Sequence, residues 1–138
     1  MTVDQASWKT TPGRFVQSFF ATAAVGGILA SLPHGLAMVF ISPIAIIVWM
    51  SGLLIVGWPC WSLLCAIGLR SRAAAIIQGA VLPAAIVFAL KIDFSVIGTV
   101  PVPVMAAVHA VAGAVAAWVG WSIAYRREFP SDTAELFR

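Results

Sequence analysis

The distribution of charge along the chain constrains its fold more than any other feature. The long run from Phe15 to Leu69 contains no Asp, Glu, Lys or Arg. Two further uncharged runs follow, from Ala73 to Leu90 and from Phe94 to Tyr125. About 18 or more apolar residues without a charge mark a bilayer-spanning helix. We therefore expect an integral membrane protein built almost entirely of membrane-embedded segments.

The overall composition agrees with this expectation and excludes an ordinary soluble domain. Hydrophobic residues make up 62% of the 138 positions and charged residues only 9%, with a mean hydropathy of +1.02, whereas a soluble domain carries about 25% charged residues. The net charge of +3 does not indicate nucleic-acid binding, because the cations stand singly at the ends of apolar runs. We expect one membrane domain over residues 1–138, with the lipid bilayer as a partner and no nucleic acid.

Helix-breaking residues divide the apolar runs into an all-α arrangement of four transmembrane helices. Proline and glycine interrupt helices, and they stand before residue 15, after residue 31 and between residues 91 and 103. The predicted spans are residues 15–31, 36–62, 73–90 and 104–125, with short tails at 1–14 and 126–138.

The second apolar stretch, residues 36–69, is too long for a single straight span. At about 1.5 Å per residue it makes roughly 50 Å of helix, against a hydrocarbon core of about 30 Å. A kink or an interfacial part is therefore expected within it. Ser42-Pro43 is typical of a helix start, and Gly57-Trp58-Pro59 is typical of a kink or a helix end. The sequence leaves open whether residues 36–42 or 59–69 leave the bilayer core.

The positions of the cations predict the orientation of the spans. If the N-terminus and the C-terminus are both cytoplasmic, seven of the eight cations lie on that side and only Lys91 lies on the other, as the positive-inside rule requires. Trp118, Trp121 and Tyr125 would then form an aromatic belt at the inner interface. The seven cytoplasmic cations are Lys9, Arg14, Arg70, Arg72, Arg126, Arg127 and Arg138.

Small residues recur along the predicted spans at helical spacing. In the fourth span they follow a 4-3-4-3 pattern that draws one seam along a helix face. In lipid, small residues allow the close backbone approach that drives helix association. The seam predicts packing within the bundle or an interface with another copy or subunit. Its residues are Ala106, Ala110, Gly113, Ala117 and Gly120.

Few side chains within the spans can carry chemistry. Ionisable groups inside a membrane are candidates for function because they are costly there, and His109 lies on the seam of the fourth span. His34 stands in the turn after the first span, so the two imidazoles are candidate haem ligands, although a hydrogen-bonded polar residue is the plainer interpretation. Gln78 and His109 are candidates for a polar path.

The chain lacks residues that several classes of enzyme and transporter require. No Asp or Glu lies between Phe15 and Leu90, which argues against the small multidrug-resistance exporters, whose first helix carries an embedded glutamate; here the nearest polar residue is Gln17. A thiol oxidoreductase of the quinone-reductase type would need close-spaced cysteine pairs on the outer side. Cys60 and Cys65 stand five apart on the inner half and are interpreted as small buried hydrophobes.

The middle of the chain carries a pattern of glycine, proline and leucine, Gly57-Trp58-Pro59 with Leu63-Leu64 and Gly68-Leu69-Arg70, followed by Ala73 to Gly79. This pattern, confined to the middle of the chain, resembles small four-helix inner-membrane proteins of proteobacteria, most of them uncharacterised. The resemblance implies a bacterial inner (cytoplasmic) membrane and transfers no activity or site residue.

These observations favour a small, non-enzymatic membrane protein without a catalytic residue, metal or cofactor. The leading hypothesis is an accessory or scaffold subunit that contacts other membrane subunits or copies of itself. The first alternative is a homo-oligomeric small-solute transporter or pore with Gln78 and His109 near its path. The second is a b-type haem-binding membrane anchor that uses His34 and His109.

Overall fold

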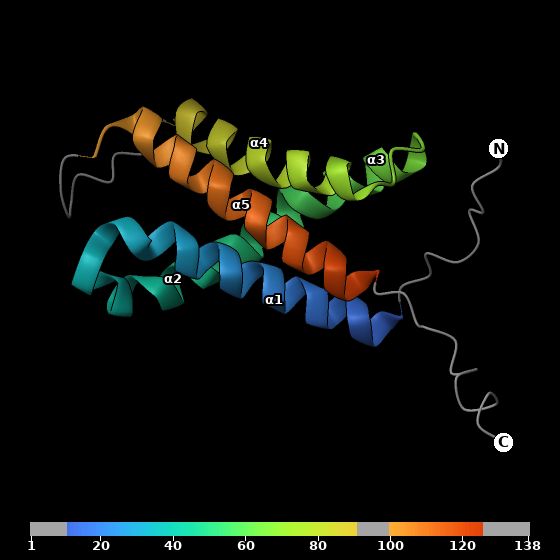
Figure 1. Cartoon of the computed structure of the whole chain (residues 1–138), viewed down its shortest axis with the longest axis horizontal. Coiled ribbons are helices and arrows are strands. Elements are labelled where there is room, and N and C mark those ends of the chain that lie inside the picture. The colour runs from blue at the N-terminus through green and yellow to red at the C-terminus, as the bar shows by residue number, and fades with distance from the viewer. Residues whose placement is uncertain (1–10, 91–99, 126–138) are drawn as a thin grey trace, which may run out of the picture.

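The computed structural model describes residues 11–90 and 100–125, and these residues are helical throughout apart from short connections (Figure 1). Helices make up 91% of them and no strand occurs among them. The elements are α1 (Pro12–Ser31), the 3₁₀ helix η1 (Leu32–Ala37), α2 (Met38–Gly52), the π-helix η2 (Leu53–Gly57), α3 (Trp58–Ala66), α4 (Arg72–Leu90) and α5 (Val102–Ala124).

Three helical stretches among the described residues are long and apolar enough to cross a membrane: Pro12–Ala66, Arg72–Ala89 and Val102–Ala124. The first of them folds back on itself at Gly35, whose φ of 58° and ψ of −131° suit glycine alone. After this reversal α2 lies antiparallel to α1, because Gly27 meets Ile46 and Gly26 meets Trp49.

Two serines join α1 and α2 next to the reversal. The Oγ atoms of Ser31 and Ser42 lie 2.8 Å apart, and each hydroxyl is also close to a carbonyl of its own helix, at 2.8 Å for Ser31 and 2.6 Å for Ser42. A hydroxyl has only one hydrogen, so two hydrogens serve three short contacts. Ser31 is 1% exposed, and the pair therefore satisfies polar groups that lipid could not hydrate.

Beyond α2 the helical path continues through η2 into α3, and we name this path, residues 38–66, the arm. At 1.5 Å per residue the arm is about 43 Å long, longer than the bilayer core. Ser42-Pro43 does not begin a helix, because α2 already starts at Met38 and Pro43 lies inside it. Gly57-Trp58-Pro59 does not end one; the π turn of η2 comes directly before it, where Pro59 deprives the preceding turn of one N–H donor.

The ends of the other helices follow local capping chemistry. The helix α1 begins three residues before the predicted start, because Thr11 accepts a hydrogen bond from the Arg14 N–H at 3.3 Å and Pro12 suits the first turn. After α3, Gly68 has a φ of 83° and the Leu69 N–H reaches back to the Leu64 carbonyl at 2.9 Å, a glycine-terminated helix end. The predicted loop at 91–103 and both tails fall largely outside the described residues.

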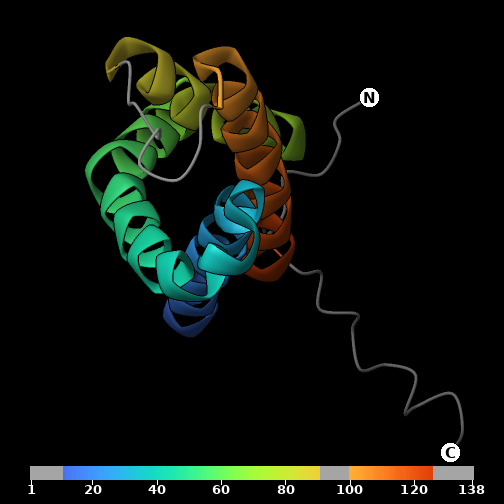
Figure 2. The same cartoon turned by 90° about the vertical axis from the view of Figure 1, so that its left-hand side faces the viewer.

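Viewed from one end, the helices stand around a central space (Figure 2). The helix α5 packs between α1 and α4, and the arm packs on α1 through α2. The contact between the arm and α4 is much smaller and involves η2 and α3. One side of the ring, between the arm and α4, is therefore only weakly closed.

Candidate functional site

A cavity of about 980 Å³ lies inside the bundle, lined by residues of α1, the arm, α4 and α5. This volume is in the range of roughly 300–1,000 Å³ that small-molecule sites occupy. Nearly all the groups that line it are apolar, among them Ile44, Val48, Leu82 and Ile86. The candidate functional site is this central cavity.

The cavity exists because one side of the ring is tightly packed and the other is not. Gly113 of α5 meets the backbone of Gly79 of α4, and a Cβ on Gly113 would overlap the Gly79 carbonyl. Gly120 of α5 lies against the Thr22 side chain of α1, and the Ser18 hydroxyl of α1 donates to the Gly120 carbonyl at 2.7 Å. We name the layer formed by α1, α5 and α4 the wall.

The wall accounts for the seam predicted on the fourth span. Ala106, Gly113 and Gly120 are buried, while Ala110 and Ala117 are half-buried, and the contacts of Gly113 and Gly120 are with α4 and α1 of the same chain. The burial extends to a second stripe that the seam did not include, at Ala112 and Ala116, which are 1% and 0% exposed. Their wider burial follows from the position of α5 between two helices.

One glutamine links the wall to the arm. The Gln78 side chain of α4 donates from Nε2 to the Gly57 carbonyl of η2 at 2.9 Å, so the amide orientation is set by this bond. Its Oε1 atom is buried and has no hydrogen-bond partner. The π turn thus presents a backbone carbonyl to α4, and Gln78 is the side chain that reaches it.

The two histidines line the same end of the cavity. Nδ1 of His109 donates to the Met105 carbonyl at 2.9 Å, which leaves Nε2 as the nitrogen directed away from the helix backbone. No group of three or more metal-ligating side chains occurs within residues 11–90 and 100–125. Two imidazoles alone match a bis-histidine haem better than a bare metal ion.

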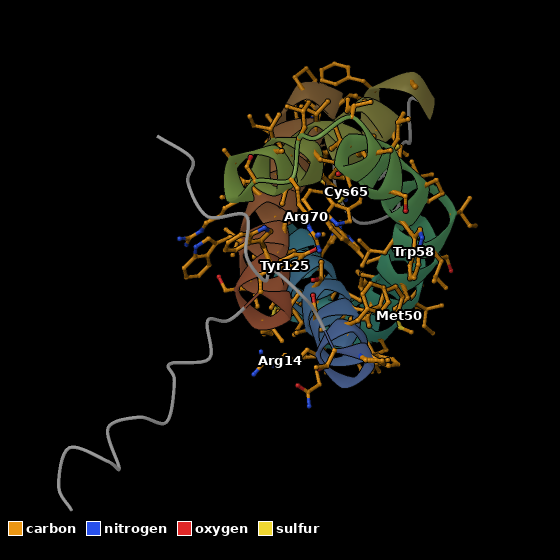
Figure 3. The ribbon with its side chains drawn as sticks, turned by 90° about the vertical axis from the view of Figure 1, so that its right-hand side faces the viewer. Arg14, Met50, Trp58, Cys65, Arg70 and Tyr125 are labelled. Atoms are coloured by element: carbon orange, nitrogen blue, oxygen red, sulfur yellow. The ribbon has the colours of Figure 1, made fainter. Side chains whose placement is uncertain are left out.

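The other end of the cavity is aromatic, and arginines outside the lining stack on its rings. Phe15, Trp58, Trp121 and Tyr125 line it, and the rings of Phe15 and Trp58 meet edge to face with centroids 4.6 Å apart. The Arg70 guanidinium lies 5.2 Å from the centroid of the Tyr125 ring. Figure 3, which looks at this end, shows Arg70 and Tyr125 close together.

Arg72 of α4 also stacks on aromatic rings of α5. Its guanidinium lies 5.3 Å from the ring centroid of Trp118 and 6.0 Å from that of Trp121, within the range of a cation–π interaction. The sequence predicted an aromatic belt here and assigned the arginines to topology only. Their stacking on α5 was missed because Arg70 and Arg72 stand far away from these rings in the chain.

The two cysteines, Cys60 and Cys65, both lie on α3 as half-buried free thiols.

No protein-family model matches this chain, and neither a curated protein nor a solved structure is significantly similar to it. The argument for function therefore rests on the geometry of the cavity and its two ends.

Proposed function

We propose that this chain is a non-enzymatic, multi-pass membrane protein that binds a small, largely apolar molecule inside its own bundle and carries it within or across the membrane. The observation that supports the proposal is the apolar cavity of about 980 Å³ between the arm and the wall. Gln78 and His109, the residues expected near a polar path, both line it. A binding site of this size within one chain favours a transporter over a scaffold.

The small-residue seam on α5 suggested an accessory subunit, but its contacts in the structure weaken the argument for that hypothesis. Its glycines are covered by α1 and α4 of the same chain. It therefore gives no separate reason to expect other membrane subunits. A scaffold remains the outcome that the experiment below would favour if the cavity binds nothing.

We infer that the protein has four spans, with both termini on the cytoplasmic side of a bacterial inner membrane. The reversal at Gly35 divides the first long helical stretch into α1 and the arm. Among the described residues, Arg14 lies in the first turn of α1, Arg70 lies between α3 and α4, and Arg72 is the first residue of α4. Arg70 and Arg72 also lie next to the end of α5. The positive-inside rule makes this end cytoplasmic, and reporter fusions after residues 35, 70 and 138 test it.

The binding proposal is tested by filling the cavity. A Cβ atom added at Gly52 in the cavity lining meets no atom within 4 Å, and the same holds for Gly13, which is outside the lining. The full chain, Gly52→Phe and the matched control Gly13→Phe are purified in a mild detergent, and bound molecules are identified by native mass spectrometry.

We expect an apolar molecule in a one-to-one ratio with the wild-type chain and with Gly13→Phe, and its loss from Gly52→Phe. Flux into proteoliposomes then separates transport from binding. A wild-type chain that carries no small molecule and co-purifies with stoichiometric protein partners would contradict the proposal and support an accessory subunit.

A second candidate function is a b-type haem anchor. The observation in its favour is that His34 and His109 line one end of the cavity together. The same purified sample distinguishes it: a Soret band that disappears in His109→Ala supports the haem anchor, and a sample without Soret absorbance ends that hypothesis.

A further inference from the structure

We propose that the molecule held in the cavity is an anionic phospholipid, with an acyl chain between the arm and the wall and its phosphate beside Arg70 and Arg72. This inference rests on the proposed function and names the chemistry of its ligand. Four observations on the described residues support it.

The shape of the cavity suits an acyl chain. Its lining on α1 extends from Phe15 to His34 in the following turn, and a helix of that length is about 30 Å long. The site is therefore long, and its lining side chains are almost all apolar. A compact polar solute would leave most of this surface without a partner, whereas a hydrocarbon chain would contact it along its length.

Three of the hydroxyls in the lining are bonded within the protein. Thr22 donates to the Ser18 carbonyl at 2.7 Å, and Ser51 donates to the Ile47 carbonyl at 3.0 Å. Ser18 donates to the Gly120 carbonyl. These hydrogens are used within the protein, so Ser18, Thr22 and Ser51 add no hydrogen-bond donor for a polar ligand.

The charge at the aromatic end suits a phosphate. Tyr125 and Trp121 line the cavity, and Arg70 and Arg72 stack on these same rings at 5.2 and 6.0 Å. A guanidinium stacked on an aromatic face keeps its N–H groups in the plane, where they match the oxygens of a phosphate. Arg70 and Arg72 thus place two positive charges beside these rings.

The arrangement also gives the lipid an orientation and a route. The opposite end carries His34 and His109 and no arginine or lysine among the described residues, so the phosphate belongs at the arginine end. Tryptophan and tyrosine at that end mark the level of the lipid head groups. The weakly closed side between the arm and α4 allows a chain to enter from the bilayer without crossing the wall.

Tryptophan fluorescence tests the proposal, because Trp49, Trp58, Trp61 and Trp121 line the cavity and brominated acyl chains quench nearby indoles. The full chain in detergent is titrated with phosphatidylglycerol and with phosphatidylcholine, both carrying brominated chains. We expect half-maximal quenching by phosphatidylglycerol at a concentration at least about tenfold lower, the discrimination that one or two charge-assisted hydrogen bonds provide.

Four variants show which part of the site produces the quenching and the lipid preference. The double variant Arg70→Gln/Arg72→Gln is expected to lose the preference for phosphatidylglycerol, whereas Arg70→Lys/Arg72→Lys retains part of it and Arg14→Gln all of it. Gly52→Phe is expected to weaken quenching by both lipids. Thermal unfolding of each variant verifies that it is folded, and the lysine variant keeps the test decisive if the glutamine variant is not.

The possible failures are distinguishable. Equal quenching by the two lipids, or an unchanged preference in the glutamine variant, overturns the phospholipid assignment while sensitivity to Gly52→Phe keeps the cavity as a binding site. Quenching that Gly52→Phe leaves unchanged places the lipid on the outer surface and overturns both proposals. Displacement by inorganic phosphate at the lipid concentration shows a phosphate site without a lipid and overturns the inference.

Discussion

The wall and the arm are both made of apolar helices, yet they are held together in different ways. In the wall, glycines allow backbone to meet backbone, as at Gly79 and Gly113, and a serine of one helix bonds a carbonyl of another. The arm carries Pro43, a π turn and large side chains, and beyond its contact with α1 it reaches α4 over a small area.

This difference shows that, in lipid, side-chain size decides where helices adhere. Burying apolar groups gives no net driving force between helices when the alternative is contact with lipid, so close packing through small residues takes its place. Phe40, which is 80% exposed, lies on the surface of the arm, and Ile55, which is 73% exposed, lines the cavity. The cavity lies between the wall and the arm, which packs closely on α1 and makes little contact with α4.

The largest loss of stability is expected from a substitution that disrupts the packing of the wall. Gly113→Leu places a side chain into the carbonyl of Gly79, which is backbone and cannot rotate away, so we expect it to destabilise the fold by roughly 1–3 kcal/mol or more. The matched change in the arm, Gly52→Leu, meets open space and should leave stability nearly unchanged. Thermal unfolding in detergent compares the two, and equal losses would show that the wall and the arm are packed alike.

A smaller effect is expected where the arm is attached to the wall. Gln78→Leu removes the hydrogen bond to the Gly57 carbonyl, worth about 0.6–1.7 kcal/mol in membranes, and also removes the buried Oε1 atom that has no partner. The two changes partly offset each other, so total stability should change little.

The local effect of Gln78→Leu should be clearer than its effect on stability. We expect faster amide hydrogen exchange in residues 53–66 and unchanged exchange in α5. Exchange that rises equally in both regions would mean that Gln78 supports the whole bundle, and not the attachment of the arm.

The smallest effect sharpens the comparison within the arm itself. Ser42→Ala removes the hydroxyl that meets Ser31 of α1 and should cost about 0.6 kcal/mol, the average for interhelical bonds in membranes. Ser51→Ala is the control, because the Ser51 hydroxyl bonds the Ile47 carbonyl of its own helix. If the two variants lower the unfolding temperature equally, the serine pair does not hold α1 and α2 together.

Much of the helical framework was predictable because its causes are local. The uncharged runs, with the breakers before residue 15, after residue 31 and between residues 91 and 103, placed the helices within a few residues of their observed ends. Errors arose where a local signal had two meanings. Ser42-Pro43 resembled a helix start, yet Pro43 lies inside α2 and the Ser42 hydroxyl bonds the Met38 carbonyl.

For the candidate site, the sequence indicated some of the residues but not how they are arranged. Gln78 and His109 stood out because polar side chains in a span are costly, but the sequence did not indicate that both line one cavity with His34. Nor did it predict that Arg70 and Arg72 stack on Trp118, Trp121 and Tyr125. These contacts join positions far apart in the chain, and no periodicity within one helix carries that information.

The sequence by itself determined that this protein is helical and apolar enough for a membrane, because the absence of charge over such long runs excludes water as the main surroundings. It also indicated one face of α5 that approaches other helices closely, because small residues permit such an approach. The tertiary structure decided which helices those faces meet, that α5 lies between α1 and α4, and that the arm remains apart from α4. The cavity results from this arrangement, because its volume depends on the relative positions of helices and not on the residues of any one of them.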